Sequence, residues 1–115
     1  MERQRIGKNA EAAAVAFLRA RGLTILLRNY RGRVGELDIV ARHGRALVVV
    51  EVRARSSDRF GGAAASIDLR KQIRIRRATA LLIRESPELA NLPIRFDVIA
   101  VRGNNIDWIQ AAFTA

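Results

Sequence analysis

Residues 35–55 read GELDIVARHGRALVVVEVRAR, and this stretch decides the fold of the chain. Two runs rich in Val, Ile and Leu flank the polar segment 42–45, which contains the glycine that a tight reversal needs. This pattern is typical of a β-hairpin. The two runs are therefore predicted to be neighbouring antiparallel strands.

Side chains alternate between the two faces of a strand, so the register of the hairpin sorts its charged residues from its apolar ones. A turn centred on His43 and Gly44 sets Glu36 opposite Glu51 and Asp38 opposite Val49. One face then carries charged residues and the other apolar residues: Glu36, Asp38, Glu51 and Arg53 against Leu37, Ile39, Val48, Val50 and Val52.

The second strand is predicted to be buried on both faces up to the carboxylate of Glu51. Leu47 and Val49 precede Glu51 on its own face. A buried carboxylate is costly unless a cation or a hydrogen-bond donor meets it. Arg53 or a divalent metal ion can supply the positive charge, and the residues alone favour the ion pair with Arg53.

The composition predicts one globular domain over residues 1–115. Half of the residues are hydrophobic and only 5% are aromatic, so the core should be aliphatic. The absence of cysteine excludes a disulfide scaffold and thiolate catalysis, and the single histidine, His43, argues against a histidine-built metal site. Any metal ion should therefore be held by oxygen.

The charge of the chain predicts a polyanionic partner. The formal net charge is +10 and the sequence pI is about 11.7, which makes nucleic acid the leading candidate. An anionic membrane is less favoured because no predicted helix pairs a basic face with bulky aromatic anchors. The N-terminal segment lacks the apolar part of a signal peptide, and no apolar run approaches a membrane span, so we expect a cytoplasmic protein.

Apolar residues at helical spacing predict a first helix over residues 6–21, which Gly22 ends. Further strands are predicted over 23–30 and 94–101, and a fifth strand at the edge of the sheet follows the turn at 103–105. Together with the hairpin, these elements predict a sheet with an antiparallel portion.

Residues 56–66 combine Ser, Asp and Gly and predict a loop, after which Ser66 or Asp68 can cap a second helix that runs to about Arg84. Its apolar stripe is predicted to comprise Leu69, Ile73, Ala80 and Leu81. Much of the remaining surface carries Arg70, Lys71, Arg74 and Arg77. A solvated basic face and a phosphate-binding surface are both open interpretations.

The order of these elements resembles the PD-(D/E)xK nuclease superfamily. The chain most closely resembles the YraN-like family of small bacterial proteins, through GKNAEAAAVAFLRARG, NYRGRVGELDIVARHGRALVVVEVRAR, FGGAAASIDLRKQ and RFDVIAV. A more distant likeness to archaeal Holliday-junction resolvases rests on the acidic helix and the GELDIV…VEVR hairpin. The resemblance implies an α/β fold with a restriction-endonuclease-like core, a mixed sheet of about five strands flanked by helices.

The resemblance also implies a metal site. In that superfamily an Asp and a Glu on neighbouring strands hold a divalent ion, and a helix Glu can assist. By motif, these roles fall on Asp38, Glu51 and Glu11, with the backbone carbonyl of Val52 as a further ligand. The implied ion is Mg²⁺ or Mn²⁺, which would neutralise a scissile phosphate and lower the pKa of a water.

The superfamily lysine that positions or activates water is replaced here by Arg53. Arginine can bind a phosphate or stabilise developing negative charge, but with a pKa above ~12 it does not act as a base. Lys71 can supply the ammonium if the second helix packs beside the hairpin. Two further carboxylates are expected to be structural: Glu36 paired with Arg53 or Arg33, and Asp97 paired with Arg95 or a neighbouring strand.

The expected function is that of a Mg-dependent endonuclease acting on DNA rather than RNA, with branched or repair intermediates as candidate substrates. One alternative is an inactive nucleic-acid-binding protein in which Arg53 neutralises the acidic cluster, and another is an adaptor that docks on an acidic protein. The likeness to resolvases is compatible with a homodimer. Basic residues along the chain are expected to contact nucleic acid: Lys8, Arg31, Arg33, Arg53, Arg55, Arg70, Lys71 and Arg74.

Overall fold

The computed structural model describes residues 2–54 and 67–114, with side chains from residue 9 onward. Arg55, Ser66, the predicted loop over 56–66 and the side chain of Lys8 lie outside the described residues. In chain order, the elements are α1 (Glu2–Ala20), β1 (Thr24–Gly32), β2 (Gly35–His43), β3 (Ala46–Ala54), α2 (Leu69–Glu85), the short 3-10 helix η2 (Pro87–Leu89), β4 (Ile94–Arg102) and β5 (Asn105–Phe113).

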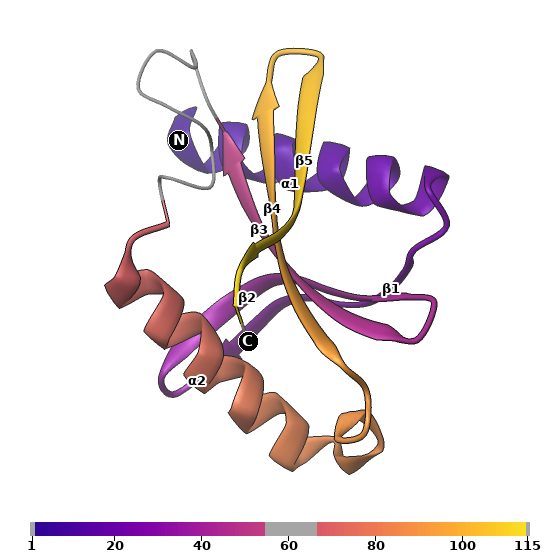
Figure 1. The fold of residues 1–115 in the computed structure, drawn as a ribbon. Coiled ribbons are helices and arrows are strands. Elements are labelled where there is room, and N and C mark those ends of the chain that lie inside the picture. Colours follow the sequence, from indigo (N-terminus) through magenta and orange to yellow (C-terminus); the bar gives the residue numbers. More distant parts are fainter. Residues whose placement is uncertain (1, 55–66, 115) are drawn as a thin grey trace.

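The five strands form one sheet in the order β1-β2-β3-β4-β5. Neighbouring strands are antiparallel except β3 and β4, which run parallel and are separated in sequence by α2. The two long helices pack on the sheet, α1 mainly against β3 and α2 mainly against β2 (Figure 1). The predicted fold class is confirmed: a mixed sheet of five strands with flanking helices, compatible with a restriction-endonuclease-like core.

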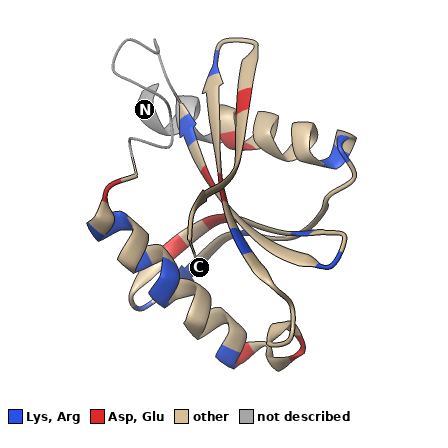
Figure 2. Cartoon of the chain, in the orientation of Figure 1, with Lys and Arg blue, Asp and Glu red and all other residues tan. Residues whose placement is uncertain are grey.

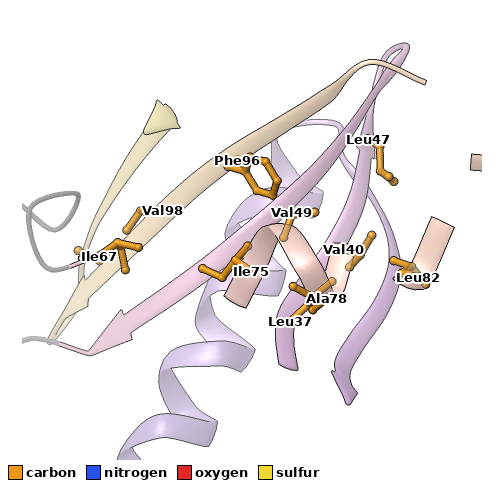
Figure 3. Packing of buried hydrophobic residues seen from close by; sticks show 11 residues of the cluster. Leu37, Val40, Leu47, Val49, Ile67, Ile75, Ala78, Leu82, Phe96 and Val98 are labelled. Atoms are coloured by element: carbon orange, nitrogen blue, oxygen red, sulfur yellow. The ribbon is translucent and has the colours of Figure 1, made fainter. Parts of the chain in front are cut away.

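Two aliphatic clusters cover the two faces of the sheet. The cluster beneath α2 joins helix and strand residues, among them Leu37, Val40, Val49, Ile75, Leu82 and Phe96 (Figure 3). The cluster beneath α1 likewise joins both kinds of element, among them Ala14, Leu18, Ile39, Val50 and Ile99. Burial of aliphatic surface on both faces is the main force that holds the helices against the sheet.

Helix α1 ends as the sequence predicts. Gly22 adopts φ +89°, a left-handed conformation that suits glycine. The amide of Leu23 donates to the carbonyl of Leu18 (3.1 Å) and that of Gly22 donates to Arg19 (3.1 Å), the paired bonds of a Schellman motif. Of the described helices, none is both long and apolar enough to cross a membrane.

The predicted hairpin between β2 and β3 is confirmed, but its register is wrong by two residues. His43 pairs with Ala46 and Ile39 pairs with Val50, so the turn consists of Gly44 and Arg45. Gly44 adopts φ +60° at the first turn position, where glycine is favoured in a tight hairpin. Continuing this register sets Asp38 level with Glu51, rather than opposite Val49.

The face assignment of the hairpin needs one further correction. Ile39, Val48 and Val50 share the face beneath α1, as predicted, whereas Leu37 belongs to the cluster beneath α2. Leu37 and Ile39 are two residues apart and would share a face in a regular strand. The alternation is therefore broken at Asp38, the residue between them.

Helix α2 begins and ends close to the predicted positions, but it buries a different stripe. Asp68 is the N-cap, and its side chain accepts a hydrogen bond from the amide of Lys71 (2.8 Å). The predicted stripe is wrong because Leu69 and Ile73 are exposed, by 67% and 40%. The buried residues of this helix are Ile75, Ala78, Thr79 and Leu82.

The turn between β1 and β2 packs closely against α2. Gly35 has φ +157°, and a β-carbon built there would lie 3.4 Å from the carbonyl oxygen of Arg74. A β-carbon on Gly32 would meet the side chain of Leu81 at 3.0 Å. Glycine at these positions lets the turn approach the helix closely.

Both edge strands of the sheet are irregular. In β1 the register with β2 shifts between Ile25 and Leu27, which leaves Leu26 as an extra residue. In β5 the register with β4 shifts opposite Asp97, and Ala111 adopts φ +51° there. The predicted fifth strand at the edge is confirmed, with this interruption in its ladder.

Candidate active site

Strands β2 and β3 part at the point where their acidic residues lie. The paired ladder ends with Ile39 and Val50, and β3 continues beside β4 as far as Ala54. The amide of Val52 donates a hydrogen bond to Oδ2 of Asp38 (2.9 Å). The Asp38 carboxylate thus takes the place of the backbone acceptor that a continued ladder would have provided.

Glu51 faces α2 and pairs with a lysine on that helix. Nζ of Lys71 lies 3.2 Å from Oε1 of Glu51, whose side chain is only 7% exposed. The Lys71 backbone is fixed by the Asp68 cap, so both ends of this residue are held. The expected ion pair is present, but Arg53 is not the partner, because α2 covers this face of β3 and brings Lys71 to the carboxylate.

Burial and neighbouring charge raise the pKa of Asp38 to about 7. The largest cause is loss of hydration, and the negative charge of Glu51 adds to it. The hydrogen bond from Val52 and the charge of Lys71 lower this pKa, whereas Glu11 raises it slightly. Residues from α1, β2, β3 and α2 therefore act on one another electrostatically at this end of the sheet.

Glu11 reaches the site from α1, but its carboxylate is already bound to β1. Oε1 accepts hydrogen bonds from Nδ2 of Asn29 (2.9 Å) and Nε of Arg28 (3.2 Å). Asn29 adopts φ +55°, a conformation that Asn tolerates better than most residues. The predicted metal-binding role of Glu11 stays a prediction, and any such role would share this carboxylate with Arg28 and Asn29.

Sequence reasoning missed Arg28 and Asn29 as partners of the site. The only local signal is a polar Arg-Asn pair inside an otherwise apolar run, LTILLRNY, which is predicted as a strand. A polar pair of this kind is ordinary in an edge strand, so it does not by itself indicate a contact with Glu11.

Arg53 makes no ion pair with Glu51 or Glu36. It follows Glu51 by two residues in β3, and its Nε is buried without a hydrogen-bond partner among the described residues. Glu36, its expected partner, instead lies 3.4 Å from Nε of Arg31, and both of those side chains are exposed. A guanidinium group in this position of the strand can donate hydrogen bonds to a phosphate oxygen.

The predicted nucleic-acid contacts divide into two groups. Arg31, Arg33, Arg70 and Arg74 are exposed, the last two on α2, where basic residues recur along the helix (Figure 2). Lys71 and Arg53 lie at the carboxylates, as described. Arg55 and the side chain of Lys8 lie outside the described residues.

The donor set fits a hard divalent ion held partly by non-protein ligands. Asp38 and Glu51 offer carboxylate oxygens, which Mg²⁺ prefers. Among the described residues, no three His, Asp or Glu side chains gather closely enough to hold an ion by themselves. Mg²⁺ is commonly bound by one or two carboxylates together with waters and substrate phosphates, which matches this pair.

A second polar network is centred on β4, between the hairpin and β5. Asp97 is fully buried and accepts hydrogen bonds from Arg95 (2.9 Å), Nε1 of Trp108 (2.9 Å) and the amide of Ala111 (3.0 Å). Arg95 also lies 3.0 Å from Nδ1 of His43. The expected pairing of Asp97 with Arg95 is confirmed. Through Arg95, Trp108 and Ala111, the network connects β4 with β5 and with the hairpin residue His43.

Comparisons with known proteins place the chain in one family. The model of the uncharacterised protein family UPF0102 matches residues 10–101. A UPF0102 protein of Saccharophagus degradans is 47% identical over 108 residues, which is 94% of this chain and 92% of that protein. One of Xanthomonas oryzae is 48% identical over 115 residues (98% and 94%), and one of Bordetella avium is 50% identical over 107 residues (93% and 73%). The chain therefore belongs to the UPF0102 family, the YraN family that its sequence resembles.

Proposed function

We propose that this protein is a metal-dependent nuclease that hydrolyses phosphodiester bonds, with DNA as the favoured substrate. The observation that carries the proposal is the meeting of Asp38, Glu51 and Lys71 where β2 and β3 part. Two carboxylates on neighbouring strands and one ammonium are the groups that metal-assisted phosphodiester hydrolysis needs.

Each residue of the site has a chemical task in this proposal. Asp38 and Glu51 would hold Mg²⁺ or Mn²⁺, and the bound ion would supply Lewis-acid stabilisation of the phosphate and a water of lowered pKa. Lys71, 3.2 Å from Glu51, would orient that water or stabilise negative charge as the leaving oxygen departs. Arg53, two residues after Glu51 in β3, would bind an oxygen of the phosphate through its guanidinium group.

The electrostatics of Asp38 and Glu51 support cation binding. Mutual repulsion and burial raise the pKa of Asp38 to about 7, so two ionised carboxylates are costly here without added positive charge. A divalent cation would relieve this repulsion, and its binding would release a proton near neutral pH. The Lys71 ammonium reaches only Glu51 in the ion pair, which leaves Asp38 as the less compensated carboxylate.

The test is a cleavage assay with branched, single-stranded and duplex DNA and with RNA, in the presence of Mg²⁺ or Mn²⁺. We expect the native protein to cleave at least one of these substrates, and Asp38→Asn to reduce the rate by more than the ~10–100-fold that loss of an outer-shell partner of a metal ligand costs. Cleavage that persists undiminished in Asp38→Asn would contradict the assignment.

A metal titration provides an independent readout. A ligand that binds only the folded state raises the unfolding temperature. Mn²⁺ should therefore stabilise the native protein and fail to stabilise Glu51→Gln. Arg45→Gln, which removes an exposed charge from the β2–β3 turn, serves as the control and should respond to Mn²⁺ as the native protein does.

One observation favours a second candidate, an inactive nucleic-acid-binding protein of the same fold. The Lys71–Glu51 ion pair already places one positive charge at the acidic cluster. If Lys71 substitutes for a metal ion, Lys71→Met should lower stability and no divalent ion should stabilise the native protein. If the site is a nuclease, Lys71→Met should lose cleavage and still be stabilised by Mn²⁺, while Lys71→Arg should retain the ion pair.

A further inference from the structure

A groove with an arginine rim lies away from the carboxylates, between the β1–β2 turn and the second half of α2. It has a volume of about 440 Å³ and is lined by Arg33, Val34, Arg77, Ala80, Leu81 and Arg84. The three arginines surround an apolar floor, and Val34 in that floor is 42% exposed. We call this feature the arginine groove.

Among the described residues, none forms an ion pair with the arginines of the arginine groove. Arg33, Arg77 and Arg84 have no ion pair or hydrogen bond with any described residue. The two nearest carboxylates in sequence are engaged elsewhere: Glu36 pairs with Arg31, and Glu85 accepts a hydrogen bond from the hydroxyl of Tyr30. Three free guanidinium groups around one hollow favour an anionic occupant.

The arginine groove is continuous with a row of basic side chains on α2. Arg70, Arg74, Arg77 and Arg84 follow one another at helical spacing, so they lie on one side of the helix. The row begins beside Lys71, the partner of Glu51. From Lys71 to Leu81 the helix rises ~15 Å, which a strand of B-form duplex, with ~3.4 Å per nucleotide, covers in about four nucleotides.

The apolar floor decides what kind of anion fits. A groove that bound only phosphates would need no Val34, Ala80 and Leu81 between its arginines. A nucleobase offers a flat apolar face that packs on such a floor and stacks with guanidinium groups. The volume of about 440 Å³ lies within the usual range for sites of small ligands. A second copy of this chain is disfavoured because its net charge is also +10.

We propose that the arginine groove binds one unpaired nucleotide of a nucleic-acid strand, with its base on the Val34–Ala80–Leu81 floor and its phosphates on Arg77, Arg84 and Arg33. The proposal rests on the proposed function, because the same strand would run along α2 to the carboxylates. It narrows the substrate class to nucleic acids with an unpaired base about four nucleotides from the cleaved bond.

The test measures binding without divalent metal, so that cleavage does not occur. The probes are a fluorescent oligothymidylate, an abasic strand of equal length, and an oligoglutamate of equal charge. Arg77→Gln/Arg84→Gln should weaken oligothymidylate binding by about tenfold, because both substituted groups contact the nucleotide. The matched control Arg19→Gln/Arg45→Gln removes two exposed charges elsewhere and should weaken binding less than threefold, a nonspecific effect.

A second variant separates the base from the phosphates. Val34→Ser should weaken oligothymidylate binding by about fivefold, as expected for loss of part of the apolar contact with the base, and leave the abasic strand unaffected. Val34 is exposed in a turn, so this variant should fold, and thermal unfolding verifies that. Equal losses for both strands, or none, would overturn the base-binding inference.

Three remaining outcomes are also decisive. If oligoglutamate binds as tightly as oligothymidylate and both depend on Arg77 and Arg84, the groove is a site for an acidic peptide and the inference fails. If the native protein cleaves DNA with metal but the groove pair binds like the control pair, only the inference about the groove fails. If the native protein neither cleaves nor binds any strand, the proposed function fails with it.

Discussion

At the scale of single residues, Asp38 is the most informative side chain of the site. Its pKa of about 7 lies well above the ordinary value of an aspartate, so the folded protein binds a proton that the unfolded chain has released between about pH 4 and pH 7. The unfolded state binds fewer protons in this window, so the free energy of unfolding should fall as the pH rises through it.

This sign predicts the behaviour of Asp38→Asn. At pH 8 the native protein ionises a largely buried carboxylate and the variant does not, so the rise of this pKa to about 7 should make the variant more stable by roughly 4 kcal/mol. At pH 5 the native Asp38 is protonated, so the difference should fall by more than half. Urea unfolding at several pH values measures it, and a variant that is equally destabilised at both pH values would contradict the raised pKa.

The positions of Asp38 and Glu51 were predictable from the sequence, but their exact partners were not. The hairpin register is displaced by two residues from the predicted one, and a displacement of two leaves every side chain on its face. Glu51 therefore faces the expected side, although Asp38 is level with it rather than with Val49. The Glu11–Asn29 hydrogen bond depends on how α1 packs on β1, which no local pattern encodes.

At the scale of elements, the orientation of α2 was the main error. The helix has apolar residues on more than one side, so helical spacing alone allowed two stripes. The sheet selects the side that contains Thr79, whose hydroxyl donates to the carbonyl of Ile75 (2.8 Å) and is thereby satisfied when buried. Because threonine counts as polar in a sequence pattern, that side looks less suited to burial than it is.

The contact of the β1–β2 turn with α2 gives a prediction at this scale. Gly35→Ala should destabilise the protein by roughly 2 kcal/mol, because φ +157° is strained for alanine and the added β-carbon would meet the Arg74 carbonyl at 3.4 Å. Chemical denaturation measures the change. The comparison is Gly103→Ala, at φ +58° with no atom within 4 Å of the new β-carbon, which should cost less.

If the two alanine variants lose the same stability, the close approach to α2 contributes nothing beyond the backbone conformation. If Gly35→Ala loses more stability than Gly103→Ala, it should also weaken binding at the arginine groove, because Arg33 and Val34 precede Gly35 in the same turn. Measuring both stability and binding therefore tests whether the conformation of the β1–β2 turn shapes the groove that it forms with α2.

At the scale of the whole molecule, the net charge of +10 predicts binding that depends strongly on salt. The logarithm of the association constant for DNA should fall linearly with the logarithm of the salt concentration. Arg74→Gln should reduce the magnitude of that slope by about 1, the value expected for one lost phosphate contact, and Arg45→Gln should leave it unchanged. Fluorescence anisotropy at several salt concentrations measures both slopes, and a slope near zero for the native protein would exclude a phosphate-dominated interface.

The overall architecture was predictable at this scale because its constraints are local and additive. Strand and helix periods and one glycine stop predict the helices and the five strands, and the family resemblance implies the mixed sheet. That β3 and β4 form the one parallel pair was not predicted. Cytoplasmic location and the choice of DNA over RNA stay predictions. The arginine groove had no sequence signal, because Arg33 and Val34 meet α2 only when the turn folds onto the helix.

The irregular outer strands have a consequence for the behaviour of the protein at high concentration. A straight outer strand offers a continuous row of amides and carbonyls on which a foreign strand can grow, the first step toward fibres. Here Leu26 interrupts one rim of the sheet, and the segment around Ala111 interrupts the other. Neither rim presents an even template, so concentrated solutions should resist fibre growth even though Leu26 and Leu27 are each 38% exposed.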